Sequence, residues 1–263
     1  MEKLEHKLWL VQIANQILGP AVSALLTPFG YHPAPGRDVI PNYLVMMLVI
    51  MVLITALCLV LRSRLSVEQP GRLQIVFEDL LGAVLGILKE YIGPTGPRYL
   101  PLVGTVGLFI FFANMIGKVP GFMSPTASVN VTLGCAITVW VYYHLQGIRV
   151  QGIFGYILHF VFPPGVPKAI GPLVGVIEII SHLSRVLSLS LRLFGNIFGE
   201  ELVVLIMASI VPLLVPLPFM VLGVVTGTLQ AFIFMLLTIV YLAGAVAVDQ
   251  GHETEAHGRA HAH

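Results

Sequence analysis

The stretch SLSLRLFGNIFGEEL, residues 188–202, decides the interpretation of the chain. It places an arginine, an asparagine and two glutamates in sequence that otherwise has the pattern of a lipid-buried helix: Arg192, Asn196, Glu200 and Glu201. An ionisable residue inside a membrane segment is costly, and by default it is a candidate functional residue. Arg192 is the sharpest case, because a guanidinium stays charged and cannot avoid this cost by losing a proton.

The composition around this stretch is that of a membrane protein. The chain has 263 residues, of which 57% are hydrophobic and 10% are charged. Soluble domains carry about 25% charged residues, so a water-soluble globule of this size would lack the charges to cover its surface. The formal net charge of +1 implies neither a nucleic acid nor an acidic substrate as a partner. We therefore expect an all-α integral membrane protein in the lipid bilayer.

Three parts are expected along the chain: an N-terminal outer segment over residues 1–41, a single membrane domain over 42–248, and a flexible His-rich cytoplasmic tail over 249–263. The outer segment is predicted to hold a short helix near residues 7–18 and then an irregular stretch rich in proline. In the membrane domain we expect about five transmembrane helices and one interfacial helix. The first two predicted spans are uncharged runs that start at Asn42 and Tyr99. Each run is long enough to cross a hydrocarbon core of about 30 Å.

Basic residues set the expected topology. The first span, over 42–61, stops at Arg62 and Arg64, and the positive-inside rule places that end in the cytoplasm. The N-terminus is then outside and the C-terminus cytoplasmic, with a cytoplasmic loop over residues 149–172. Residues 73–91 combine an apolar stripe at helical spacing with four charges, which favours a helix lying in the membrane interface.

The last third of the membrane domain has an unusual length. Residues 170–210 form one helical pattern, about 60 Å long at 1.5 Å per residue. This exceeds a perpendicular crossing, so a steep tilt or a kink is expected. Pro212, Pro216 and Pro218 are predicted to form the outer turn. A return helix over about residues 219–248 would complete a long tilted hairpin.

Helical geometry separates the charges of the 170–210 helix. A polar stripe lies within about 40° of Arg192 and comprises Glu178, Arg185 and Asn196. Glu201 points about 180° away from Arg192. By helical rise, Glu178 lies about 21 Å from Arg192 toward one end, and Glu201 about 14 Å toward the other. Two carboxylates at different depths, separated by a fixed positive charge, suit two access routes that do not join.

Carboxylates and imidazoles can relay protons, since they change charge state near working pH. An arginine cannot, so Arg192 would act as a barrier and as an electrostatic partner that favours ionisation of a nearby carboxyl group. The chain offers no carboxylate at the depth of Arg192. We therefore expect the partner carboxylate to come from another chain.

Other interpretations stay open from these residues. Arg192 could be a structural residue paired with Glu200 or Asn196, and the two glutamates could mark the approach of the helix to the outer interface. Ser128, Asn130 and Thr132 could serve in capping and interhelical hydrogen bonds, or line a wet cavity. A secondary transporter with its substrate bound near Arg192 is an alternative function, although such folds often show inverted repeats and none is found. A purely structural membrane subunit is a third possibility.

Four motifs resemble subunit a of the F-type ATP synthase. LSLRLFGNIFGEEL at 189–202 is similar to the arginine motif of that family, and QAFIFMLLTIVYL at 230–242 to the motif of its last helix. FFANMIGKVPG at 111–121 and PTASVNVTL at 125–133 resemble two further family segments. The resemblance runs in the expected order from about residue 40 to 248 and leaves out both tails.

The resemblance implies a stator subunit that translocates protons. Arg192 corresponds to the essential arginine that faces the rotating ring of c subunits. Two offset half-channels would carry protons to and from the carboxylates of that ring. Glu201 matches the carboxylate of the outer half-channel and Glu178 that of the cytoplasmic one. The expected lining residues of the two half-channels are Glu178, Ser181, His182, Asn196, Glu200, Glu201, Gln230, Asn114, Asn130 and Tyr241.

One position departs from the family pattern. Some members carry a histidine on the last helix as the partner of the Glu201 position, and here the matching residue is Gly223. Glu200 is also outside the common pattern and would supply extra acidity.

The resemblance also implies the surroundings of the chain. Its expected partners are the c-subunit ring, the peripheral stalk of b subunits, the remainder of the ATP synthase and the lipid bilayer. The expected location is an energy-coupling membrane, the bacterial plasma (inner) membrane. No cofactor, metal site or nucleic acid is expected, and the chain is not expected to be catalytic alone.

Overall fold

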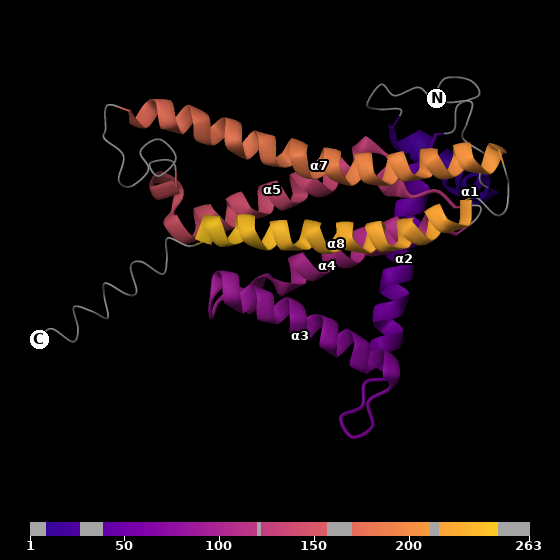
Figure 1. Ribbon diagram of the computed structural model, residues 1–263, viewed down its shortest axis with the longest axis horizontal. Coiled ribbons are helices and arrows are strands. Elements are labelled where there is room, and N and C mark those ends of the chain that lie inside the picture. Colours follow the sequence, from indigo (N-terminus) through magenta and orange to yellow (C-terminus); the bar gives the residue numbers. More distant parts are fainter. Residues whose placement is uncertain (1–8, 27–38, 120–121, 157–169, 211–215, 247–263) are drawn as a thin grey trace, which may run out of the picture. The chain divides into compact units, whose positions relative to one another are not determined.

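The computed structural model describes residues 9–26, 39–119, 122–156, 170–210 and 216–246. The described residues form helices joined by turns (Figure 1). Its long helices are α1 (Trp9–Leu26), α2 (Asn42–Ser63), α3 (Arg72–Ile92), α4 (Leu100–Ile116), α5 (Val129–Gln151), α7 (Gly171–Ile210) and α8 (Pro216–Val246). Short 3₁₀ turns precede α4 and α5, over Gly96–Tyr99 and Pro125–Ala127. The prediction of an all-α integral membrane protein is confirmed.

Four described segments are long and apolar enough to cross a membrane: Asn42–Ser63, Gly96–Ile116, Leu173–Ile210 and Pro216–Val246. They correspond to α2, α4 with its preceding turn, α7 and α8. Helix α5 has 23 residues, which is also enough to span at 1.5 Å per residue, but its composition is more polar. That α5 also crosses the membrane, which would bring the number of spans to five, stays a prediction.

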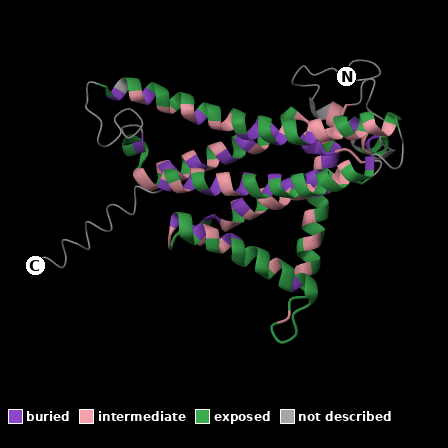
Figure 2. Cartoon of the chain, in the orientation of Figure 1, coloured by how far each residue is buried: buried purple, intermediate pink, exposed green. Residues whose placement is uncertain are grey.

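Helix α2 shows how the first span is built. It begins after Pro41, whose extended backbone starts the helix, and it ends at Ser63, just before Arg64. Most of its side chains are exposed (Figure 2), and most of the exposed ones are apolar, including Leu48, Met51 and Val52. A helix with an apolar exposed surface is stable only where lipid or protein covers that surface.

Helix α3 corresponds to the predicted interfacial helix. Its apolar residues Val84, Leu88 and Ile92 are buried, whereas Leu73 and Leu80 of the same stripe are exposed. The helix ends at Gly93, whose φ of 85° is one that a glycine adopts without steric cost.

Several predicted boundaries were wrong. Helix α1 continues to Leu26 with Pro20 inside it, where an irregular stretch was expected. Pro216 and Pro218 lie in the first turn of α8, which tolerates proline because its backbone N–H groups have no intrahelical partner there. The predicted cytoplasmic loop includes the end of α5, a helical turn at residues 153–156 and the first residues of α7. Pro212, residues 157–169 of that loop and the His-rich tail lie outside the described residues.

The chain divides into two compact units. The first comprises Met1–Arg64, Leu108–Val131 and Phe194–Leu229, and the second comprises Leu65–Gly107, Thr132–Leu193 and Gln230–His263. Helices α7 and α8 are each divided between the units: the C-terminal part of α7 and the N-terminal part of α8 belong to the first unit, and their other parts belong to the second. The first unit has a core of Val11, Ile40, Val45 and Met46. Each unit also contains a cluster of polar side chains that includes predicted site residues.

Candidate functional site

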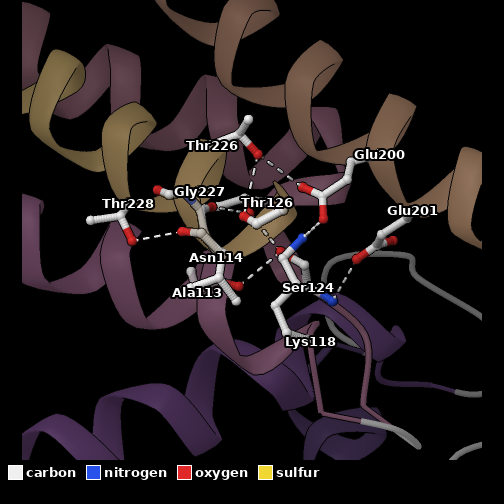
Figure 3. A network of polar contacts seen from close by, with 12 residues as sticks. Ala113, Asn114, Lys118, Ser124, Thr126, Glu200, Glu201, Thr226, Gly227 and Thr228 are labelled. Atoms are coloured by element: carbon white, nitrogen blue, oxygen red, sulfur yellow. Dashed lines mark hydrogen bonds and ion pairs between the residues drawn. The ribbon is translucent and has the colours of Figure 1, made fainter. Parts of the chain in front are cut away.

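The glutamate cluster lies in the first unit, where α7 meets the segment that joins α4 to α5. We define it by Asn114, Lys118, Ser124, Thr126, Glu200, Glu201 and Thr226 (Figure 3). Glu201 Oε1 accepts a hydrogen bond from the backbone N–H of Ser124 at 3.1 Å. Gly117 leaves the room for this bond, since a Cβ there would lie 2.7 Å from Ser124 Cβ and 2.9 Å from Glu201 Oε1.

Glu200 has a different set of partners from its neighbour. Its carboxylate is ion-paired with the ammonium of Lys118, and Oε2 accepts a bond from the Thr226 hydroxyl at 3.4 Å. A Cβ at Gly223 would overlap the Glu200 carboxylate. The departure from the family pattern at Gly223 thus has a structural reason, because the side chain of Glu200 fills the space that a larger residue would need.

Asn114 joins α4 to α8 within this unit. Its Nδ2 donates to the backbone carbonyl of Gly227 at 3.0 Å, and its Oδ1 accepts from the Thr126 hydroxyl at 2.7 Å. Both Asn114 and Thr126 are fully buried. Gly227 permits the close approach, since a Cβ there would lie 3.2 Å from Asn114 Cβ. Asn114 is therefore a packed and hydrogen-bonded residue beside the two glutamates.

The histidine cluster lies in the second unit and connects α5 with α7. We define it by Tyr143, His144, Glu178, His182, Arg185 and Tyr241. The Tyr143 hydroxyl is 2.7 Å from Nδ1 of His182, and Nε2 of His182 is 3.3 Å from Glu178 Oε1. A carboxylate only accepts hydrogen bonds, so in the neutral imidazole Nε2 donates and Nδ1 accepts from the tyrosine.

Further rings surround His182. The ring centroids of His144 and His182 are 5.0 Å apart, and the guanidinium of Arg185 lies 5.3 Å from the centroid of the Tyr241 ring. His182 is buried, while 40% of the Glu178 side chain is exposed. This arrangement links a buried imidazole to a partly exposed carboxylate one helical turn away, which is a suitable geometry for passing a proton.

Arg192 lies on an exposed face of α7. Its Nη2 donates to the hydroxyl of Ser188, one turn earlier, at 3.4 Å. The interpretation of Arg192 as a residue paired with Glu200 is not favoured, because Glu200 is ion-paired with Lys118. Asn196, one turn after Arg192, is also exposed.

The other predicted lining residues have varied positions. Gln230 is buried in α8, and Ser181 is half-buried in α7. Asn130 Nδ2 donates to the Tyr43 hydroxyl at 3.3 Å, and the hydroxyls of Thr132 and Ser190 are 3.1 Å apart. These last two contacts join α5 to α2 and to α7, as the interpretation of interhelical hydrogen bonding predicted.

Sequence reasoning missed several members of both clusters. Lys118 stands in the FFANMIGKVPG motif but was not among the predicted site residues. Tyr143 and His144 are adjacent polar aromatic residues in the largely apolar sequence of α5, and this pattern could have singled them out. The partners of each are far away in sequence, so no local spacing indicated them.

Comparison with known proteins agrees with these motifs. The family model described as "ATP synthase A chain" matches residues 44–243. A protein of Helicobacter pylori (strain Shi470) named "ATP synthase subunit a" is 49% identical over 219 residues, which cover 82% of this chain and 94% of that protein. Proteins of the same name are 48% identical in Helicobacter acinonychis (strain Sheeba), over 82% of this chain and 94% of that protein, and in Campylobacter jejuni (strain 81-176), over 76% and 88%.

The matched region contains both polar clusters, Arg192, all of α4 and α7, and nearly all of α2 and α8. The alignments with the Helicobacter proteins cover nearly the full length of those relatives. This integral membrane protein belongs to the ATP synthase A chain family, and hence to the membrane sector of the F-type ATP synthase.

Proposed function

We propose that this chain is the proton-translocating stator subunit of its ATP synthase, with Arg192 separating two half-channels. The main support for this proposal is the placement of charged residues along α7. This one helix presents an exposed arginine in its middle and has its carboxylates toward the two ends, Glu178 on one side and Glu201 on the other. The chain is not itself catalytic and works as the ion-conducting component of the complex.

The glutamate cluster would form the outer half-channel. Glu201 is half-buried, and its Oε1 accepts a hydrogen bond from the backbone N–H of Ser124 at 3.1 Å, which leaves Oε2 to exchange with a proton carrier. Asn114 and Asn130 belong to the same unit and add polar groups to this route. A proton from the outside would pass Glu201 to reach a carboxylate of the c ring.

The histidine cluster would form the cytoplasmic half-channel. Glu178 is exposed enough to meet water, and His182 connects it to Tyr143 inside the protein. Ser181 and Tyr241 flank this path. A c-ring carboxyl group that approaches Arg192 would lose its proton, because a nearby positive charge favours the ionised form, and the proton would leave past Glu178.

The partners follow from this role. The exposed face of α7 around Arg192, Gly195 and Asn196 would face the c-subunit ring, with the ring supplying the carboxylate that this chain lacks at that depth. The b-subunit stalk and the rest of the synthase would hold the chain in place. We infer an inner-membrane location with the N-terminus outside and the C-terminus in the cytoplasm, from the basic residues that flank the first span.

Proton flux in vesicles that contain the assembled synthase tests the proposal. Arg192→Ala is expected to abolish ATP-driven pumping and to raise passive proton flux through the membrane sector, because the barrier between the two half-channels is lost. Arg149→Ala, at an exposed position in the last turn of α5 and outside both clusters, is the control, and it should leave the passive flux low. Normal pumping by Arg192→Ala, with the complex intact, would contradict the proposal.

A further inference from the structure

We propose that Lys118 is a positioning residue that determines which of the two adjacent glutamates carries protons. Its ammonium engages Glu200, and this leaves Glu201 as the exchanging carboxylate of the outer route. The inference rests on the proposed function of the glutamate cluster as the outer half-channel. It adds a residue that stands outside the predicted lining set.

Lys118 lies in the turn after α4, where its backbone N–H donates to the carbonyl of Met115 at 3.0 Å. Its side chain is ion-paired with Glu200, and the exposed fractions of the two side chains are 11% and 14%. An ion pair this deeply buried has little access to water, so removal of one partner leaves an uncompensated charge.

Glu200 is held by groups from the turn after α4 and from α8. The turn after α4 supplies the ammonium of Lys118, and α8 supplies the Thr226 hydroxyl and the open space above Gly223. Figure 3 shows the carboxylate of Glu200 directed at the Lys118 nitrogen and the Thr226 oxygen. With partners on two elements, Glu200 is held in one position.

Glu201 differs from Glu200 in its direction on the helix and in the partner of its carboxylate. Successive residues of a helix point about 100° apart, so the two carboxylates leave α7 in different directions. Glu201 meets the backbone N–H of Ser124 where Glu200 meets an ammonium. A backbone donor carries no net charge, so a carboxylate that accepts from it can take up a proton without leaving a buried cation unpaired. Lys118 thereby assigns proton exchange to Glu201.

ATP-driven proton pumping by the whole synthase in vesicles tests the assignment. Glu201→Gln is expected to pump at most about a tenth as fast as the wild type, since general acid–base groups contribute 10²–10⁴-fold. Lys118→Met releases Glu200, so the double variant Lys118→Met/Glu201→Gln should pump at least about threefold faster than Glu201→Gln alone. A purely structural lysine predicts the opposite, because the second substitution would only add damage.

A second pair of variants approaches the ion pair from the other side. Glu200→Gln leaves the Lys118 ammonium without its partner and free to engage Glu201, so pumping should fall. Adding Lys118→Met to Glu200→Gln should then raise pumping above that of Glu200→Gln alone. Lys118→Arg keeps the cation and should keep most of the rate, and Lys89→Met on the exposed end of α3 should leave it unchanged.

The inference is overturned if neither double variant pumps faster than its Glu201→Gln or Glu200→Gln parent, with comparable amounts of complex in the membranes. It is also overturned if Lys118→Met pumps like the wild type and Glu201→Gln stays fully inactive in its presence. Arg192→Ala is measured in parallel. Normal pumping by that variant contradicts the proposed function itself, whereas the Lys118 results bear only on the assignment between the two glutamates.

Discussion

The carboxylate of Glu200 occupies the space above Gly223, so closely that a Cβ on that glycine would overlap it. The two residues lie on α7 and α8, and the ion pair with Lys118 fixes the carboxylate there. The position where some family members carry a histidine is thus occupied in space by a side chain from the neighbouring helix. A polar group is retained at the same place, although it comes from another residue.

Gly223→Ala should therefore impair the synthase through Glu200. The added methyl group would push the carboxylate away from Lys118, and we expect ATP-driven pumping in vesicles to fall severalfold. Glu200→Asp in the same chain should recover part of the loss, because the shorter side chain reduces the overlap and still offers Lys118 a carboxylate. Gly244→Ala is the matched control on α8, where a Cβ meets no atom within 4 Å. An equal effect of both alanines would contradict the steric explanation.

Asn114→Leu should destabilise the first unit. The substitution keeps the approximate volume but removes the amide that bonds the Gly227 carbonyl and the Thr126 hydroxyl, and Thr126 keeps only its contact with the Ser124 hydroxyl among the described residues. An unsatisfied buried polar group costs about 1–3 kcal/mol, so we expect the chain to dissociate from the purified complex at a lower temperature. Thr228→Val is the control, since that exposed hydroxyl bonds only the carbonyl of Val224 on its own helix. Unchanged thermal dissociation of Asn114→Leu would show that these bonds are replaced by water.

Tyr143→Phe should slow proton release on the cytoplasmic side. It removes the hydroxyl that lies 2.7 Å from Nδ1 of His182 and leaves the ring packing in place. We expect a severalfold loss of pumping with a normal amount of assembled complex, measured in the same vesicles. Tyr142→Phe changes the adjacent residue, outside the cluster, and should have no effect. If the two variants behave alike, the Tyr143–His182 bond has no part in proton transfer.

Arg192→Lys separates charge from shape at the proposed barrier. A lysine keeps a positive charge but lacks the planar fork of five donors, and it can lose its proton when buried. We expect pumping to fall well below the wild-type rate while the passive proton flux stays lower than in Arg192→Ala. The two fluxes are measured in the same vesicles, with ATP and without it. A leak as large as that of Arg192→Ala would show that a positive charge alone does not form the barrier.

The amino-acid sequence by itself determined the helices and their environment. Uncharged runs longer than the hydrocarbon core leave a helix as the form that satisfies the backbone in lipid, and α2, α7 and α8 follow the predicted runs to within a few residues. The boundaries that failed involve prolines, as at Pro20 and Pro216, because a proline is tolerated in the first turn of a helix and its effect inside one depends on packing. Arg192 and Glu201 could also be identified from the sequence alone, because a charge in an apolar run has a free-energy cost that the adjacent apolar residues do not compensate.

The tertiary structure alone decided which side chain meets which. Lys118 and Glu200 are separated by 82 positions and Tyr143 and His182 by 39, and no periodicity along one helix relates residues on two helices. The position at Gly223 could be understood only once the carboxylate of Glu200 was seen beside it. Pairing of this kind depends on how helices pack, because a hydrogen bond or a buried ion pair requires atoms within about 3 Å of each other, a condition that sequence spacing does not express.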